Sequence, residues 1–322
     1  MKNSYASAVL ESPGRVSVSR QVLPPPAPGE IRVRLEGCGI CGSNLPIWEG
    51  RPWFDYPREP GSPGHEAWGR VEAAGDRVTR FAIGDRVALL SAHAFAEVDF
   101  APQEHAVRLP AGLDGMDFPG EALGCAMNVL ERADIRRDQW VAIIGIGFLG
   151  AVLTRLCSSR GARVIAISRR SRSLAMAESM GASHVLPLEE PWHVAAVVKD
   201  ITGGAMCDRV IEATGLQAPL DVASELCAER ARLTIAGYHQ DGLRQVDMQL
   251  WNWRGIDVIN AHERDPARYI AGMEAAISAV LSGELRAADF ITHRFTLGQT
   301  GAALELLRRR DGNFIKAVLR YD

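Results

Sequence analysis

The sequence predicts an α/β fold in which a β-rich domain accompanies a doubly wound parallel sheet, and three observations support this. Short strand-like runs broken by turns fill residues 16–107. A glycine-rich turn, G-I-G-F-L-G at 145–150, joins an apolar strand-like run to a small-residue helical stretch. Strand and helix patterns then alternate, which is typical of a parallel sheet with helices on both faces.

The first part of the chain contains β-like runs separated by proline and glycine. The runs predicted as strands are 31–36, 66–73 and 86–90. Turn signals lie at 24–26, 28–29, 61–64 and 84–85, where proline and glycine favour tight turns. A β-rich domain is therefore expected here rather than a βα repeat.

The second part alternates between the two periodicities. Predicted helices are 122–133, 151–157, 171–180, 192–201, 219–226 and 268–282, and predicted strands are 141–144, 163–167, 184–186, 207–212, 232–237 and 257–260. The tail from residue 291 has a mixed pattern. We expect residues 121–261 to form the dinucleotide-binding domain, and residues 1–120 with 262–322 to form the second, catalytic domain.

Composition excludes several classes of protein. The 322 residues are 47% hydrophobic and 23% charged, as in ordinary globular proteins. A net charge of −3 gives no electrostatic reason to bind nucleic acid or an anionic membrane. The N-terminus is too polar for a secretory signal, and no apolar run is long enough to span a bilayer. Six scattered cysteines favour reduced thiols or a metal site, so a cytoplasmic location is expected.

The glycine-rich turn predicts a dinucleotide site. Gly145 would allow a sharp turn, Gly147 would let the backbone approach a pyrophosphate, and Gly150 would let the helix pack close to the strand. Ile146, Phe148 and Leu149 complete the predicted phosphate loop. The alternative, an ordinary tight turn, stays open from this segment alone.

The end of the next strand suggests which nicotinamide cofactor binds. Ser168 stands where an acidic residue would contact the ribose hydroxyls of NAD, and Arg169 and Arg170 follow it. Guanidinium groups suit a 2′-phosphate, so NADP(H) is favoured over NAD(H). The alternative is a solvated basic start to a helix.

Three segments carry residues that bind metals. Cys41 offers a thiol, His65 and Glu66 an imidazole and a carboxylate, and Glu121 a second carboxylate. Such a set suits a catalytic zinc that keeps one position for water or substrate. Taken singly, each residue could equally be structural: a buried thiol, a turn histidine or surface glutamates.

In this combination the chain resembles the medium-chain dehydrogenase/reductase family, in its zinc-dependent alcohol and polyol (sorbitol-type) branch. The resemblance runs from about residue 8 to the C-terminus. It is carried by segments 37–43, 63–69, 84–87, 145–150, 213–215 and 236–237. It implies a GroES-like catalytic domain before a Rossmann cofactor domain.

The resemblance also implies roles for the metal-type residues. Cys41 and His65 would be zinc ligands, Glu66 would bind the metal or exchange with it, and Glu121 would be the acidic third ligand. Cys125 is a rival for that third place. The four-cysteine lobe of many relatives is absent between residues 85 and 97, so one catalytic zinc and no structural zinc are expected.

Two departures from the family affect the proton route. The usual aspartate is Asn44, and a histidine often found two positions further on is Pro46. Ser43 remains the candidate for first proton acceptor, beside the catalytic residues Cys41 and His65. Its alternative role is a turn hydroxyl bonded to its own backbone.

Further contacts are implied by position within the family pattern. The later cofactor loops would be Ala213, Thr214, Gly215, Gly237 and Tyr238, with Lys316 reaching the cofactor phosphate; Trp48, Phe54 and Asn128 would line the substrate pocket. For the aromatic segment that holds Trp48 and Phe54, the alternative is interdomain or subunit packing.

The function implied is hydride transfer between a secondary alcohol, polyol or sugar-like hydroxyl and NADP or NAD, giving the ketone. The expected partner is a small hydroxylated substrate, and the expected assembly is a homodimer or homotetramer. Two alternatives are a zinc-free NADP-dependent double-bond reductase, which would lack the Cys41 and His65 ligands, and a non-catalytic nicotinamide-cofactor-binding protein.

Overall fold

The computed structural model describes residues 3–321 and divides into two compact units. The terminal unit comprises the residues up to Gly124 together with those from Asp265 onward, and the central unit is Cys125–Arg264. The boundaries predicted from the sequence were 120/121 and 261/262. Helix α2 (Gly120–Ala133) crosses the first division point.

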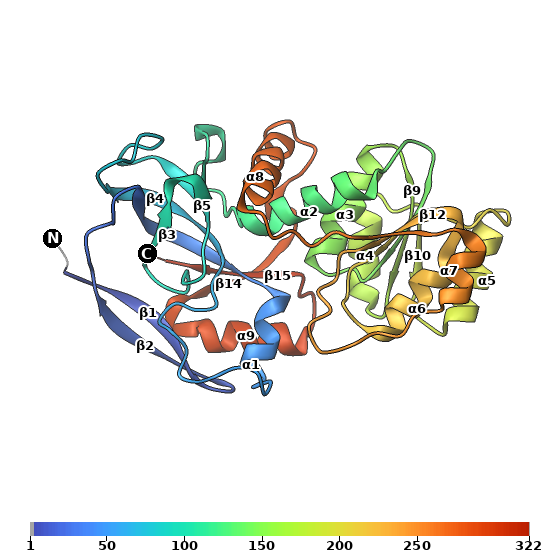
Figure 1. The fold of residues 1–322 in the computed structure, drawn as a ribbon, viewed down its shortest axis with the longest axis horizontal. Helices are drawn as coiled ribbons and strands as arrows, with labels where there is room; N and C mark the ends of the chain where they lie inside the picture. Colours follow the sequence, from blue (N-terminus) through green and yellow to red (C-terminus); the bar gives the residue numbers. More distant parts are fainter. Residues whose placement is uncertain (1–2, 322) are drawn as a thin grey trace. The chain divides into compact units, whose positions relative to one another are not determined.

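The terminal unit is built on a seven-stranded sheet in the order β14-β15-β3-β4-β5-β7, with β6 also pairing with β3 (Figure 1). Strands β1 and β2 form a separate hairpin. Strands near both ends of the chain therefore build one sheet. The strands are β1 Ser4–Ser12, β2 Arg15–Val22, β3 Glu30–Ile40, β4 Glu66–Ala74, β5 Arg86–Leu90, β6 Val98–Pro102, β7 Ala106–Arg108, β14 Ile291–Thr296 and β15 Lys316–Arg320. The helices are α1 Leu45–Trp48, α8 Pro266–Leu281 and α9 Thr300–Arg309.

Strand β3 shows why this sheet forms. Ile31, Val33 and Leu35 alternate with polar residues and are buried, as expected for a strand with one face on the core. Arg32 and Arg34 lie between them and both pair with Glu72. From residue 37 onward every residue of β3 is buried. The strand therefore ends inside the unit, just before Cys41.

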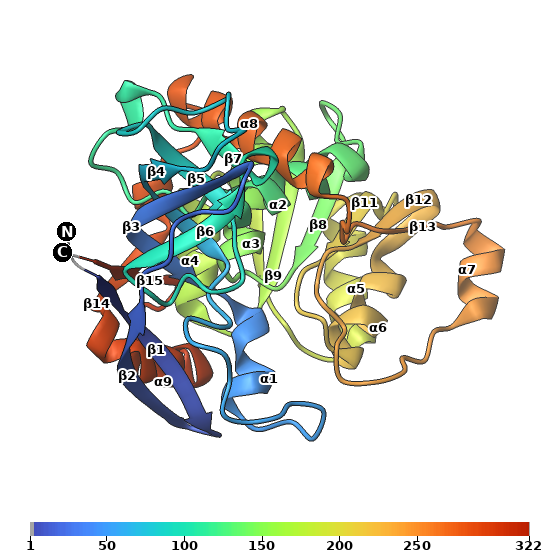
Figure 2. The same ribbon diagram turned by 60° about the vertical axis from the view of Figure 1, so that its left-hand side comes forward.

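The central unit is a six-stranded parallel sheet in the order β10-β9-β8-β11-β12-β13. Helices α3 and α4 cover one face and α5 and α6 the other (Figures 1 and 2). The strands are β8 Trp140–Ile144, β9 Arg163–Ser168, β10 His184–Pro187, β11 Cys207–Glu212, β12 Cys227–Ile235 and β13 Asp257–Asn260. The helices are α3 Phe148–Ser159, α4 Ser171–Ser179, α5 Pro191–Ile201, α6 Gln217–Leu226 and α7 Met248–Arg254.

This strand order confirms the predicted doubly wound sheet. Strand β8 lies between β9 and β11, so the order reverses there and leaves a switch point at the carboxyl ends of the strands. In open parallel sheets, ligands bind in the crevice at such a point.

Two sequence-based expectations need correction. Strand β12 begins at Cys227 rather than at residue 232, and Arg230 interrupts its regular pairing with φ +58°. Helix α7 was not predicted because none of its described residues is buried, so it has no apolar stripe. Asp247 caps its first turn, and Gly255 ends it in a left-handed conformation. The mixed tail resolves into β14, α9 and β15. Within residues 3–321, every helix is too short or too polar to cross a membrane.

Candidate active site

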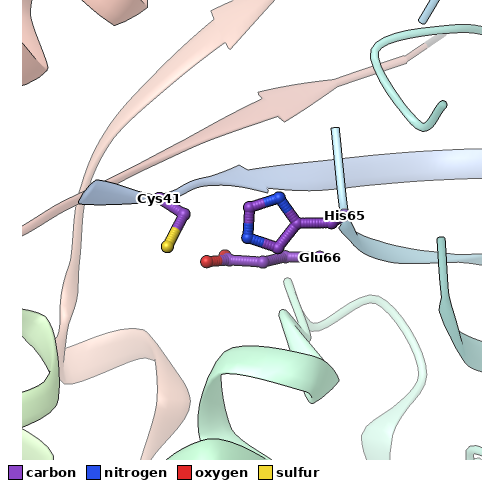
Figure 3. Close-up of side chains that lie close together, drawn as sticks. All are labelled: Cys41, His65 and Glu66. Atoms are coloured by element: carbon purple, nitrogen blue, oxygen red, sulfur yellow. The ribbon is translucent and has the colours of Figure 1, made fainter. Parts of the chain in front are cut away.

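The two strands at the centre of the terminal unit bring together the predicted metal ligands. Strands β3 and β4 pair antiparallel with Gly39 opposite Glu66, so the end of β3 lies beside the start of β4. Cys41 directly follows β3, and His65 directly precedes β4. The Cys41 sulfur, a ring nitrogen of His65 and a carboxylate oxygen of Glu66 all lie within 4.8 Å of one another (Figure 3).

Hydrogen bonding fixes which nitrogen of His65 is available. Nδ1 lies 2.8 Å from the Pro63 carbonyl oxygen. A carbonyl only accepts, so Nδ1 carries the proton and the Nε2 lone pair is free in the neutral ring. Nε2 lies 3.5 Å from the Ser43 hydroxyl. Metal-binding histidines are commonly oriented in this way, by a backbone carbonyl on the other nitrogen.

The electrostatics of the cluster favour a cation. Burial opposes a charge on His65, but the hydrogen bond and charge of Cys41, together with Glu121 and Glu66, raise its pKa to about 10. Burial likewise opposes the charge on Lys316, while Glu66, Cys41 and Glu121 raise its pKa. The surrounding acidic groups thus outweigh burial at both positions, as at a site that binds a divalent ion.

Glu66 provides the most direct test of whether zinc fits. Its side chain is fully buried, and Oε1 accepts a hydrogen bond from the Lys316 ammonium at 2.5 Å. Oε2 is also buried and has no hydrogen-bond partner within residues 3–321. A buried oxygen left in this way is costly unless a ligand engages the carboxylate. One sulfur, one nitrogen and one oxygen donor with a fourth position left open are a catalytic zinc set.

Asn44 holds the two ligand segments together. Its Oδ1 accepts a hydrogen bond from the Cys41 backbone at 2.9 Å, and its Nδ2 donates to the Pro63 carbonyl at 3.3 Å. The side chain is buried. The asparagine that departs from the family pattern therefore orients both Cys41 and the segment before His65.

Lys316 is the residue whose environment differs most from expectation. It was predicted to reach the cofactor phosphate, but it is only 3% exposed and pairs with Glu66. The apolar run that follows Lys316 in the sequence could have indicated that this lysine is buried. Strand β15 lies between β14 and β3 and is buried on both faces, so a charge at its start needs a buried partner.

The remaining predicted residues of the terminal unit have varied environments. Trp48 is 6% exposed, packs in the core and donates a hydrogen bond from Nε1 to Glu305 on α9. Phe54 is half-buried against the same core. Glu121 is not one of the three clustered donors, although its charge raises the pKa of His65.

Two predicted residues on α2 belong to the central unit. They are Asn128, which is buried, and Cys125, which is half-buried.

The glycine-rich turn of the central unit has the predicted local geometry. Gly145 follows β8 with φ +98°, which favours glycine. A side chain on Gly150 would lie 2.1 Å from the Gly145 carbonyl oxygen, so helix and strand pack closely there. No atom of the described chain approaches within 4 Å of the corresponding position on Gly147, the N-cap of α3. Ile146 is buried, and Phe148 and Leu149 open the helix.

The loops after β11 and β12 converge on this turn. A side chain on Gly145 would meet Thr214 at 2.4 Å, and one on Gly237 would meet the Gly215 nitrogen at 2.2 Å. Ala213 also lies beside Gly145. Tyr238 is half-exposed and stacks on His262, with ring centroids 5.1 Å apart. The predicted cofactor residues Gly145, Ala213, Thr214, Gly215, Gly237 and Tyr238 therefore gather at the carboxyl ends of β8, β11 and β12.

The residues predicted to select between NADP and NAD lie at the end of β9. Ser168 is buried, Arg169 is exposed and Arg170 is half-buried. The Arg170 backbone nitrogen lies 3.5 Å from the Ser168 hydroxyl. A hydroxyl and an exposed guanidinium group thus follow the strand where NAD-type sites carry an acid.

A β-rich unit with a sulfur, nitrogen and oxygen cluster, joined to a doubly wound sheet with a phosphate-type turn, defines the class of metal-assisted dehydrogenases. Comparison with known proteins agrees. Residues 27–129 match the alcohol dehydrogenase GroES-like domain, and residues 149–278 match the zinc-binding dehydrogenase domain.

The chain is also similar to individual dehydrogenases. It is 24% identical to sorbitol dehydrogenase of Halalkalibacterium halodurans over 95% of this chain and 96% of that protein. It is 30% identical to an alcohol dehydrogenase of Rhizobium meliloti over 62% and 68%. A Sinorhizobium meliloti structure described as a zinc-binding dehydrogenase bound to NADP superposes with a TM-score of 0.85, at 23% identity and 99% and 100% coverage.

The chain belongs to the zinc-binding alcohol dehydrogenases of the medium-chain dehydrogenase/reductase family. It is accordingly an oxidoreductase that uses zinc and NAD(P).

Proposed function

We propose that this enzyme oxidises a secondary hydroxyl of a polyol or sugar-like substrate to the ketone, with one catalytic zinc and NADP(H). The observation that carries the proposal is the cluster of Cys41, His65 and Glu66, in which Glu66 is buried and the other two are half-buried. Its fully buried carboxylate has an oxygen without a hydrogen-bond partner in the described chain. The similarity to sorbitol dehydrogenase supports the polyol class.

Cys41, His65 and Glu66 would hold the zinc, and Glu121 would be the alternative acidic third ligand. When bound, zinc is a Lewis acid that lowers the pKa of a substrate hydroxyl. Ser43, half-buried with its hydroxyl 3.5 Å from His65 Nε2, would accept the hydroxyl proton first while releasing its own. Neither Asn44 nor Pro46 can carry a proton onward, so the proton passes from Ser43 to water.

A metal analysis combined with a substrate screen tests the proposal. We expect about one zinc per chain, as for a three-ligand catalytic site, and oxidation of polyols, cyclitols or sugars with NADP. Cofactor binding without zinc or alcohol turnover would instead support a non-catalytic binding protein. Zinc-free reduction of activated double bonds would support the reductase alternative.

Preference for NADP(H) is supported by Ser168, Arg169 and Arg170 at the end of β9. Arg169 is exposed, and its guanidinium group suits bidentate contact with a 2′-phosphate. We expect Arg169→Asp to weaken NADP and spare NAD, because it places a carboxylate beside the phosphate. Arg160→Asp, an exposed residue at the end of α3, makes the same charge change as a control. An unchanged preference in Arg169→Asp would overturn this part of the proposal.

We also propose that the enzyme is a dimer or tetramer formed through the outer edge of the central sheet. Strand β13 is the edge strand of this sheet, and α7, which contacts β12, has no buried residue among those described. Leu243 is fully exposed, and Trp253 is 86% exposed. Exposed apolar groups beside an unpaired edge are typical of an interface. Light scattering of Trp253→Glu against the unmodified enzyme tests this, and an unchanged assembly would contradict it.

A further inference from the structure

Glu212, the last residue of β11, is a fully buried carboxylate that accepts hydrogen bonds from two separate loops. Oε1 accepts from the Thr214 backbone at 2.6 Å and from the Thr214 hydroxyl. The Gly215 nitrogen lies 3.1 and 3.2 Å from the two oxygens. Oε2 lies 2.9 Å from His239 Nε2, in the loop after β12. One buried side chain thus joins the loops after β11 and β12.

The protonation of His239 follows from its second partner. Arg244 Nε lies 2.8 Å from His239 Nδ1. A guanidinium group only donates, so Nδ1 accepts and the ring proton is on Nε2, where it is donated to Glu212. Arg244 also donates to the Gly215 carbonyl at 2.9 Å and pairs with Asp241. These contacts therefore form one hydrogen-bond network that connects the end of β11 with the loops after β11 and β12.

The backbone packs closely around this hydrogen-bond network. A side chain on Gly237 would lie 2.7 Å from Glu212 Oε2. Gly215 has φ +78°, and a side chain there would lie 2.5 Å from the Tyr238 carbonyl oxygen. The two glycine backbones pack around the carboxylate, so its position sets theirs.

We propose that Glu212, His239 and Arg244 form a clasp that positions residues 213–215 and 237–238 for the nicotinamide cofactor. All three are positioning residues, because they act through the backbone of these loops. Both ring nitrogens of His239 are engaged within the clasp, so this histidine does not serve the nicotinamide or the substrate. The inference rests on the proposed function in one respect, that these loops contact the cofactor.

The first test measures the affinity for NADPH and NADH by calorimetry. His239→Phe keeps a ring but removes both hydrogen bonds, each of them to a charged group, and should weaken binding about tenfold or more. His239→Gln restores a donor for Glu212 and should recover part of the loss, which a purely structural role for the ring would not produce. His193→Phe is the control, because His193 pairs with Glu189 on the exposed surface of the same unit.

The second test measures amide hydrogen exchange of residues 213–216 and 236–239 without cofactor. We expect faster exchange in His239→Phe and a smaller increase in Arg244→Met, which leaves the hydrogen bond between His239 and Glu212 in place. Unchanged affinity and unchanged exchange in these variants would overturn the clasp. If the unmodified enzyme bound neither NADPH nor NADH, the proposed function would fail, while the exchange rates would still decide whether the clasp exists.

Discussion

Glu66 in the terminal unit and Glu212 in the central unit are both fully buried carboxylates, but their oxygens are satisfied differently. Glu212 accepts hydrogen bonds at both oxygens from Thr214, Gly215 and His239. Glu66 accepts one from Lys316, and its Oε2 has no partner in the described part of the chain.

This difference separates a structural carboxylate from a ligand. Burying a carboxylate is tolerated only when its lone pairs are engaged. At Glu212 the protein itself engages them, so the group organises loops. At Glu66 the residues that the structure describes leave Oε2 unengaged beside a thiol and an imidazole, so the group is suited to a metal ion. Four experiments test this difference between the two carboxylates.

The largest effect is expected from removing the sulfur donor. Cys41→Ala should abolish zinc binding and lower kcat/KM at least about a thousandfold, because a catalytic metal contributes several kcal/mol to the barrier. Zinc content and alcohol oxidation measure this. Cys125→Ser tests the rival ligand and should retain the metal. Full zinc occupancy in Cys41→Ala would contradict the assigned cluster.

A paired substitution tests the contrast between the two carboxylates. Glu212→Gln places the donating amide NH2 group next to the donors that contact the carboxylate. It should therefore lower the free energy of unfolding by about 2 kcal/mol, and by the same amount with zinc bound as with a chelator present. Glu66→Gln should instead remove most of the extra stability that zinc gives. Urea titrations in both conditions measure the two effects. The contrast would be wrong if Glu212→Gln and Glu66→Gln responded to zinc in the same way.

Asn44 should affect the metal through the ligand segments that it joins. Asn44→Ala is expected to weaken zinc about 10- to 100-fold, as is usual for groups that orient ligands. Asn44→Asp keeps an acceptor for the Cys41 backbone but loses the donor to Pro63, so an intermediate affinity is expected. Competition with a chromophoric chelator measures both variants. Unaltered affinity in Asn44→Ala would show that the ligands hold their positions without this residue.

The smallest effect is a dependence of zinc binding on pH. The pKa of His65 is raised to about 10, but only the neutral ring binds metal. Below that pH zinc must displace a proton, so its affinity should rise with pH, about tenfold per unit for one proton released, and should level off near the pKa. Calorimetry in two buffers of different ionisation enthalpy counts the proton. No proton release at neutral pH would refute this explanation.

Local sequence was sufficient for much of the fold. The alternating patterns between residues 141 and 260 predicted the parallel sheet, and Gly145 and Gly150 have the geometry that their turn requires. Helix α7 was not predicted, because hydrophobic periodicity identifies a helix by its buried apolar face. None of the described residues of this helix is buried. The start of β12 was missed because a left-handed residue interrupts its ladder.

The site could be predicted only in part, because some of its contacts depend on strand order. Cys41, His65 and Glu66 lie at strand ends that a single antiparallel pairing brings together. Lys316 is 250 residues from Glu66 in the chain, and their contact requires knowing that β15 and β4 flank β3. Trp48 had an aromatic side chain that suited a pocket, but tertiary packing of α1 places it in the core.

Gly39 links these features, because a side chain there would lie 1.7 Å from Glu66 Oε2. Glu66 and Lys316 project from the strands on either side of β3, and the carboxylate occupies the space that a methyl group at position 39 would fill. The sizes of residues 39 and 66 are therefore interlocked. Anyone redesigning this enzyme to accept another metal would have to change both positions together, since enlarging the first displaces the second.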